Sequence, residues 1–373
     1  MPRVSTVLGA SLFLASAVSA VPYANSTEPV RIGKRCTSTI SSLSDVTDSA
    51  LECTTINIKS FSVPAGKTFD ISNLADGTTV NLLGDVTFGY KEWDGPLFQI
   101  GTKSKTATWH FNGNGHTLNG QGAQYWDGKG TNGGKTKPHP MVKLYHGTGS
   151  FKDVTVLNSP AQAVSVGTSA AFTISGVTID NSAGSSKGHN TDCFDVSADD
   201  VTITGNVCKN QDDCLAVNKG SNIEFSDNKC SGGHGISIGS VKSDHNVESV
   251  TISGNTVTDS ANGLRIKTVY GATDAAVTNI VYKDNTVSGI SKYGVVIEQD
   301  YENGSPTGKP SNGVTLGPVT FEGTNKVSVN SGAKEVYVLC GSKCTGTWDW
   351  SGLSVSGGSS GSINYDHISN FKL

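Results

Sequence analysis

The stretch that decides the fold reads Asn190-Thr191-Asp192, Gln211-Asp212-Asp213-Cys214, Gly232-Gly233-His234-Gly235 and Arg265-Ile266-Lys267, in that order. Asp192, Asp213 and His234 follow one another at equal spacing, and the sequence between them is strand-like. In a chain that winds on itself once per about 20 to 30 residues, this spacing stacks the polar groups on one face.

Strand-like segments of one common form repeat around this stretch. Each alternates β-branched or aromatic residues with polar ones and ends in a turn of Gly, Asp or Asn. A second strand follows the turn, as in Gly235-Ile236-Ser237-Ile238. The repeats predict an all-β fold, a right-handed parallel β-helix; the leucine pattern of the competing horseshoe fold is absent. The repeated segments are Phe172–Gly176, Val201–Asn206, Ile223–Asn228, Val250–Asn255, Val281–Asn285 and Val319–Gly323.

The N-terminus has the form of a secretory signal peptide. Arg3 precedes an apolar run that extends to Val18, and Val18-Ser19-Ala20 fits a cleavage site. Residues 1–20 are therefore predicted to be a signal peptide, and a short buried helix is the alternative. No apolar run after residue 20 is long enough to cross a bilayer.

A dibasic pair follows the predicted signal peptide. Residues 21–35 are polar and end in Lys34-Arg35, so they are predicted to be a propeptide. An ordinary solvated charge pair is the alternative. Residues 36–373 show no break in composition, so we expect one β-helix catalytic domain.

The composition and net charge of the chain limit the kinds of molecule that it can bind. The chain has 373 residues, 45 of them glycine and only two methionine, which favours strands and turns over helices. Its formal net charge is −4, so nothing attracts nucleic acid or an anionic membrane. An anionic partner would have to be held by local Arg and Lys side chains.

Eight cysteines in a secreted chain predict a disulfide framework. Cys340 and Cys344 are close enough to clip one loop. Cys36 and Cys53 bracket Thr37–Glu52, where apolar residues have rough helical spacing. We expect a short amphipathic helix there, pinned over the open end of the β-helix. We identify no cap at the C-terminal end, and Gly357–Ser362 is expected to be flexible.

The other four cysteines are spaced by about one coil. Cys193–Cys208 and Cys214–Cys230 would then be equivalent bridges on neighbouring coils. Two buried free thiols at Cys193 and Cys208 are the alternative, and the spacing leaves both open.

The acidic residues and the cations should share one face of one sheet. Strand side chains alternate, so Arg265 and Lys267 point outward while Ile266 points to the core. Grouped carboxylates suit glycoside hydrolysis, which needs one protonated acid and one ionised base. Packing like charges together raises the pKa of one of them and so creates the acid.

Any one of these residues has a simpler interpretation, because Asp-Asp turns are usually solvated and single histidines are usually structural. The combination of motifs resembles the signature of the fungal endopolygalacturonases. These are pectin hydrolases of glycoside hydrolase family 28 with a right-handed parallel β-helix. Further matching segments are Gly122–Gly128, Asn158-Ser159-Pro160 and Gln299–Gly304, so the resemblance runs from about residue 36 to 345.

The resemblance implies a role for each residue. Asp212 would be the general acid, and Asp192 and Asp213 would position and deprotonate the attacking water. The other implied roles are His234 holding the ionisation of the acids, Arg265 and Lys267 binding galacturonate carboxylates, and Asn190 and Tyr301 lining the cleft. The resemblance also implies inversion at the anomeric carbon, no metal or cofactor, and a monomer that binds polygalacturonic acid (homogalacturonan).

Two departures from the family pattern concern disulfides. Family members commonly carry a last disulfide near the C-terminus, but Gly361–Leu373 has no cysteine. Cys193 and Cys208 are extra by comparison.

Three alternative functions are an exo-acting polygalacturonase, a Ca²⁺-dependent pectate lyase and a non-enzymatic adhesin for acidic glycans. The sequence shows no large insertion between Asp192 and Tyr301, which favours an open groove and cutting at internal bonds. Asn303-Gly304-Ser305 is a glycosylation sequon, which we expect to be unoccupied because a glycan would crowd the cleft.

Overall fold

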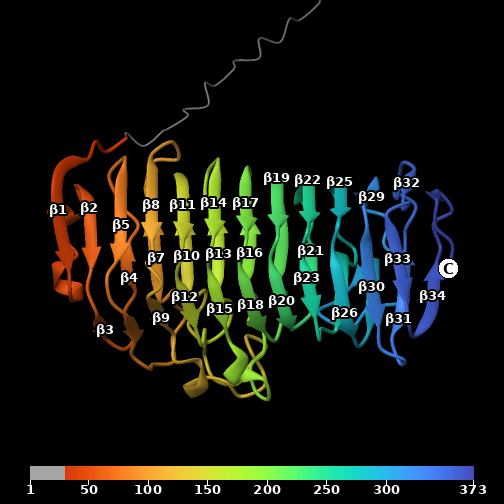
Figure 1. The fold of residues 1–373 in the computed structure, drawn as a ribbon, viewed down its shortest axis with the longest axis horizontal. Helices are drawn as coiled ribbons and strands as arrows, with labels where there is room; N and C mark the ends of the chain where they lie inside the picture. Colours follow the sequence, from red (N-terminus) through yellow and green to blue (C-terminus); the bar gives the residue numbers. More distant parts are fainter. Residues whose placement is uncertain (1–29) are drawn as a thin grey trace, which may run out of the picture.

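The computed structural model describes residues 30–373 and shows coils stacked along one long axis (Figure 1). The predicted signal peptide and most of the predicted propeptide lie outside the described residues. The part of the propeptide that is described runs into β1 (Lys34–Ile40), and both Arg31 and Lys34 form ion pairs with Glu52. No helix in residues 30–373 is long and apolar enough to span a membrane.

Each coil contributes a strand to each of three parallel sheets, in the order sheet 1, sheet 2, sheet 3. The predicted right-handed parallel β-helix is thus confirmed. Sheet 1 contains β4 (Phe69–Ile71), β7 (Phe98–Gly101), β10 (Val142–Tyr145), β13 (Val164–Gly167), β16 (Phe194–Ser197), the first part of β19 (Leu215–Ser226), β21 (Ile236–Val241), β24 (Asn262–Val269), β27 (Tyr293–Tyr301), β31 (Lys334–Leu339) and β34 (Ser359–Ile363).

Sheet 2 joins sheet 1 because β19 runs through both, so that together they count as one 22-stranded sheet. It contains β1, β2 (Cys53–Ile58), β5 (Thr78–Leu82), β8 (Thr108–Asn112), β11 (Thr148–Lys152), β14 (Phe172–Ser175), β17 (Val201–Thr204), the second part of β19, β22 (Asn246–Ser253), β25 (Ala275–Lys283), β28 (Val314–Leu316) and β29 (Val319–Glu322).

Sheet 3 has 11 strands. They are β3 (Phe61–Val63), β6 (Val86–Phe88), β9 (Thr117–Asn119), β12 (Thr155–Leu157), β15 (Thr178–Asp180), β18 (Val207–Asn210), β20 (Lys229–Gly232), β23 (Thr256–Thr258), β26 (Thr286–Ile290), β30 (Asn325–Val329) and β33 (Leu353–Ser356). Single 3-10 turns, η2 (Gly122–Gln124) and η3 (Ser182–Gly184), lie in loops between sheets 3 and 1.

The core is built from rows of inward side chains in register. In sheet 1, each residue of one such row pairs with its counterpart on the next strand, and all of them are buried. The row consists of Phe194, Leu215, Ile236, Leu264 and Val295. The residue after each of them faces outward, because strand side chains alternate. The alternation that was predicted for Arg265 and Lys267 therefore holds across the whole sheet.

A ladder of buried asparagines explains the Asn that ends the repeated segments. Asn206, Asn228, Asn255, Asn285 and Asn325 lie on successive coils, and each side-chain oxygen accepts hydrogen bonds from the backbone and side chain of the preceding one. They are at most 1% exposed. The ladder pairs backbone groups at the tight turn between sheets 2 and 3 that the strand ladders leave unpaired.

The N-terminal cap differs from its prediction. The Cys36–Cys53 disulfide forms, but the helix over Thr37–Glu52 was wrong in extent. The helix α1 covers only Asp48–Leu51, after the 3-10 turn η1 (Leu43–Asp45). Residues up to Ile40 instead pair with β2, because a Thr-rich, β-branched segment next to an open strand edge gains a full hydrogen-bond ladder.

The C-terminal end is closed by aromatic side chains, which the sequence did not reveal as a cap. Trp348 and Trp350 are fully buried and pack against Tyr365, Phe371 and Phe321. The short strands β32 (Trp348–Asp349) and β35 (Ile368–Ser369) pair there. The segment expected to be flexible was also misjudged, because most of it forms β34, parallel to β31.

Two more predicted disulfides are present, Cys214–Cys230 and Cys340–Cys344. The Cys193–Cys208 bridge is not formed, so the alternative of two buried free thiols is the one observed. Cys208 pairs in register with Cys230, one coil away, as the spacing suggested. Reduced cysteine packs well in an apolar interior, and here the two thiols contact each other.

Candidate active site

The predicted site residues converge where the chain turns from sheet 3 into sheet 1. Asp192 lies two residues before β16, Asp213 two before β19, and His234 two before β21. Arg265 and Lys267 stand on the outer face of β24. The stacking that the sequence predicted is therefore present in the structure.

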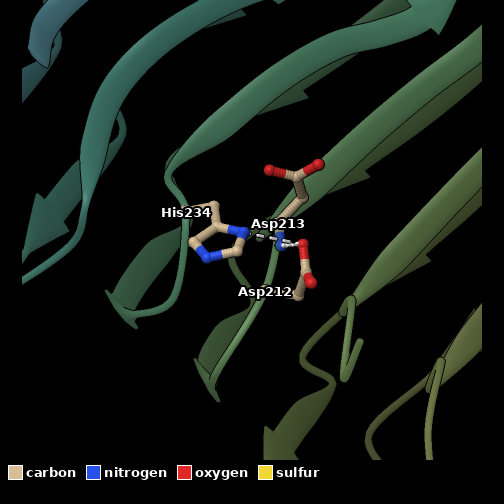
Figure 2. Close-up of side chains that lie close together, drawn as sticks. All are labelled: Asp212, Asp213 and His234. Carbon is tan, nitrogen blue, oxygen red and sulfur yellow. Dashed lines mark hydrogen bonds and ion pairs between the residues drawn. The ribbon is translucent and has the colours of Figure 1, made fainter. Parts of the chain in front are cut away.

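Asp212 and His234 face each other, while the Asp213 carboxylate points to the other side (Figure 2). His234 Nδ1 is 2.9 Å from Asp212 Oδ1. The backbone N–H of Asp213 donates to the same oxygen. This approach needs the glycines before His234: a Cβ on Gly233, where φ is +64°, would lie 2.1 Å from the Asp212 carbonyl oxygen.

Asp213 is buried and surrounded by donors. Lys267 Nζ lies 2.8 Å from Oδ2, and Arg265 and Ser237 both donate to Oδ1. Burial alone would raise the pKa of Asp213, but the charges of Arg265 and Lys267 outweigh burial and lower it to about 2. Asp213 is thus ionised at pH values well above 2.

Asp192 has the opposite electrostatics. Burial, together with the negative charges of Asp212 and Asp195, raises the pKa of Asp192 well above its ordinary value. Burial and the charges of Asp213 and Asp212 likewise raise the pKa of Asp195 to about 7. The cluster therefore contains carboxyl groups with pKa values pushed apart, as acid-base catalysis requires.

Asn190, predicted to line the cleft, does so but is also fully engaged with protein groups. Its Nδ2 donates to Asp212 Oδ2 at 3.2 Å. Its Oδ1 accepts from the Thr131 backbone and from Asn132 Nδ2, both at 3.1 Å. The Asp212 carboxylate is held between Asn190 on one oxygen and His234 on the other.

The loop that contacts Asn190 has its own buried anchor. Asp127 accepts hydrogen bonds from the backbone of Lys129 and Lys135 and an ion pair from Lys137, 2.8 Å away. The Lys137 side chain is only 1% exposed. This anchor fixes the loop against the turn that carries Asn190 and Asp192, where Gly130 is so close to Asn190 that a Cβ would lie 2.3 Å from its Oδ1.

A cavity of about 260 Å³ opens between these groups. Arg265 does not line this cavity. The predicted residues that do line it are Asn190, Asp192, Asp212, Asp213, His234, Lys267 and Tyr301. Lys267 Nζ also lies 4.9 Å from the centre of the Tyr301 ring. Lys267 thus contacts both the Asp213 carboxylate and the Tyr301 ring.

Several lining residues were missed from the sequence. Asp195 had a usable signal, because it lies between the inward residues Phe194 and Val196 and must face outward on the same sheet. His189 stands next to the Asn-Thr-Asp motif. Asn132 comes from a distant loop and had no local signal, whereas Asn303 belongs to the sequon that was expected beside the cleft.

Asp212, Asp213 and His234 offer possible metal ligands within 4.8 Å of one another. The donor set is a poor fit for a cation. Asp213 is already neutralised by two cations, and His234 Nδ1 is engaged with Asp212. The arrangement is better suited to exchanging a proton at Asp212 and polarising a water molecule beside Asp213.

The comparisons with known proteins agree with this geometry. A sequence profile of Glycosyl hydrolases family 28 matches residues 53–372. An endo-polygalacturonase of Sclerotinia sclerotiorum is 52% identical over 314 residues, which cover 83% of this chain and 80% of that protein. The probable endopolygalacturonase A of Aspergillus parasiticus is 48% identical over 338 residues, 90% and 91% of the two chains.

A solved structure is also similar. Endopolygalacturonase I from Stereum purpureum, complexed with two galacturonate molecules, superimposes with a TM-score of 0.82 at 47% identity. The match covers 88% of this chain and 97% of that one.

Proposed function

Because this chain belongs to family 28 of the glycosyl hydrolases, we propose that it is an endopolygalacturonase that hydrolyses internal α-1,4-galacturonosyl bonds of polygalacturonate. The observation that carries the proposal is the cavity in which Asp192, Asp212 and Asp213 meet His234 and Lys267. Several carboxyl groups in one cavity can supply both an acid and a base, and the cation suits a substrate that is itself a carboxylate.

In the proposed reaction, Asp212 donates its proton to the departing glycosidic oxygen. His234 and Asn190 hold the two Asp212 oxygens and so aim the acid. His234 is the more exposed partner of the pair and can return a proton to Asp212 from solvent after each turnover. The acid is thereby reset for the next bond.

Asp213 would activate the attacking water. Both of its oxygens already accept hydrogen bonds from cations, which makes it a weak nucleophile toward carbon but keeps it ionised as a base. Asp192, which lines the same cavity, would help to position this water. Water attack opposite the leaving group gives inversion, which we propose for this enzyme.

Substrate binding would involve Lys267, Arg265 and Tyr301. Lys267 reaches the cavity and can share its charge between Asp213 and a galacturonate carboxylate, while Arg265 acts through Asp213 from behind. Secretion is proposed from the pattern of residues 1–20 and from three disulfides, which form in oxidising compartments. We further propose that residues 21–35 are removed and that the enzyme acts as a monomer.

The deciding experiment is a time course of product sizes on polygalacturonate, with NMR of the first anomer released. Mid-length oligomers of inverted configuration at early times are expected. Galacturonate monomer from the start would instead identify an exo-acting enzyme.

The Ca²⁺-dependent lyase considered from the sequence would have to hold its cation at Asp212, Asp213 and His234, although Arg265 and Lys267 already neutralise Asp213. It predicts an unsaturated product that absorbs in the ultraviolet and activity that is abolished by a chelator. The hydrolase predicts neither.

A further inference from the structure

Two loops from opposite edges of sheet 1 reach toward each other over the cavity. The upstream loop, residues 127–137, leads from sheet 3 into β10 and stands at the edge that carries the catalytic turns. The downstream loop, residues 302–311, leaves β27 for β28 at the other edge. The sheet between them is the floor of the groove.

The two loops touch through a pair of asparagines. Asn303 Nδ2 donates to Asn132 Oδ1 at 3.4 Å, across a sequence separation of 171 residues. Both side chains line the cavity, as do groups from each edge of the sheet, such as Asp212 on one side and Asn218 on the other. The contact therefore spans the groove above the cavity.

The two sides of this contact differ in how they are held. The upstream loop is fixed by Asp127 and the buried Lys137, and Asn132 is also bonded to Asn190. The backbone N–H groups of the downstream loop bond to residues within it and to the end of β27, as in Ser305 N–H to Glu302 and Gly308 N–H to Asp300. These bonds tie the loop to its own strand and not to the opposite edge, so we take the downstream loop as the side that moves.

We propose that Asn132 and Asn303 form a strap that determines which chains reach the catalytic groups. This inference rests on the proposed function. An internal bond of a long polymer has no nearby end, so it can enter only from the side, while the strap is open. A short oligogalacturonate can thread beneath the closed strap from its end.

The side chains of the closed strap are also chemically suited to contact a bound galacturonate chain. The two carboxamides are uncharged, so they present donors and acceptors to sugar hydroxyls without repelling a polyanion. Because Asn132 contacts Asn190, and Asn190 contacts Asp212, closure occurs directly over the acid. The strap would thus hold a bound chain at the bond that is to be cleaved.

The test is to lock the strap with the double variant Asn132→Cys/Asn303→Cys and a short bifunctional maleimide. The native free thiols Cys193 and Cys208 are buried and should not react. Compared with the unlinked double variant, the linked enzyme should release reducing ends from polygalacturonate at least about tenfold more slowly, while its tetragalacturonate hydrolysis should differ by less than about twofold. Each single-cysteine variant treated in the same way is the control.

An unchanged ratio of polymer to tetramer activity in the linked enzyme would overturn the proposal. If the link blocks hydrolysis of both substrates, the variant Asn303→Ala decides, because it cannot form the strap. Its ratio of polymer activity to tetramer activity must then rise, and an unchanged ratio counts against the strap. Absence of hydrolysis of either substrate by the unmodified enzyme would instead refute the proposed function.

Discussion

His234 Nδ1 and Asp212 Oδ1 lie 2.9 Å apart, at the only turn where two consecutive acids meet a histidine in the described residues 30–373. The contact joins the proposed proton donor to a side chain that can exchange protons with solvent. It is the relationship on which the acid half of the mechanism depends.

Asp212→Asn should lower kcat by about a hundredfold or more, because the amide has no proton of suitable acidity to donate. The amide retains the size of the carboxyl group and one acceptor oxygen for His234 and the Asp213 backbone, but loses the acceptor for Asn190, so the melting temperature should fall only slightly. Initial rates of reducing-end release, measured beside thermal unfolding, check both. Turnover near that of the unmodified enzyme would exclude Asp212 as the acid.

Asp192→Asn should abolish most activity but stabilise the fold near neutral pH. A raised folded-state pKa favours the fold below the ordinary pKa of 3.8, and this contribution is lost as pH rises through the folded-state pKa. The neutral amide avoids that loss, so Tm at pH 7 should rise by about 1 to 3 °C. Below pH 3.8 the two proteins should melt alike, and an equal gain at both pH values would contradict this explanation.

Lys267→Met should shift the acidic limb of the pH profile to higher pH. Arg265 and Lys267 lower the pKa of Asp213, and removing one cation raises it, so the ionised base is lost sooner as the pH falls. KM for polygalacturonate should also rise, and less so for a methyl-esterified substrate. A profile of kcat/KM against pH checks the first effect. If the acidic limb does not move, Asp213 is not the base.

Asn255→Ala should destabilise the protein by about 2 to 4 kcal/mol, because it removes paired hydrogen bonds and leaves buried backbone groups without partners. Asn81→Ala is the matched control. Asn81 stands in a similar stack with Asn57, but on the outer face of sheet 2 and in contact with water. Denaturant unfolding should show a cost there of about 1 kcal/mol or less.

Asn303 should carry no glycan in active enzyme, although Asn303-Gly304-Ser305 is a sequon. A glycan on its Nδ2 would remove the donor that contacts Asn132 and would fill the mouth of the cavity. Intact-mass analysis of the secreted protein, before and after enzymatic deglycosylation, tests this. Sugar on Asn303 in fully active protein would show that the downstream loop is not needed in its observed position.

The repeated pattern made much of this fold predictable. Alternation and the recurring Asn turn placed the strands, the core rows and the outward direction of Arg265, because these depend on local geometry that each coil repeats. The same reasoning extends to Asp195, which the motif search passed over. The C-terminal aromatic cap and the extent of β1 were not predictable in this way, because they depend on which open edge a segment meets in space.

The site was predictable where neighbouring coils supply it and unpredictable where distant loops do. Asp192, Asp213 and His234 are each one coil from the next, so equal spacing located them together. Asn132 reaches the cavity from a loop several coils away, and Asn303 from the opposite edge. The second role of Asn190, which is bonded on both sides, also required three-dimensional contacts.

The proposed catalytic groups stand on three successive coils, with Asp192 on the first, Asp212 and Asp213 on the second and His234 on the third. The distances between coils therefore follow the strand separation of about 4.8 Å rather than the conformation of any single loop. The regular spacing of the coils therefore sets the distances between the acids on neighbouring coils and His234. Removing a whole winding ahead of β7 would shorten the β-helix and leave these distances unchanged. Removing the winding that runs from Asp192 to Asp213 would instead delete Asp212, the proposed acid.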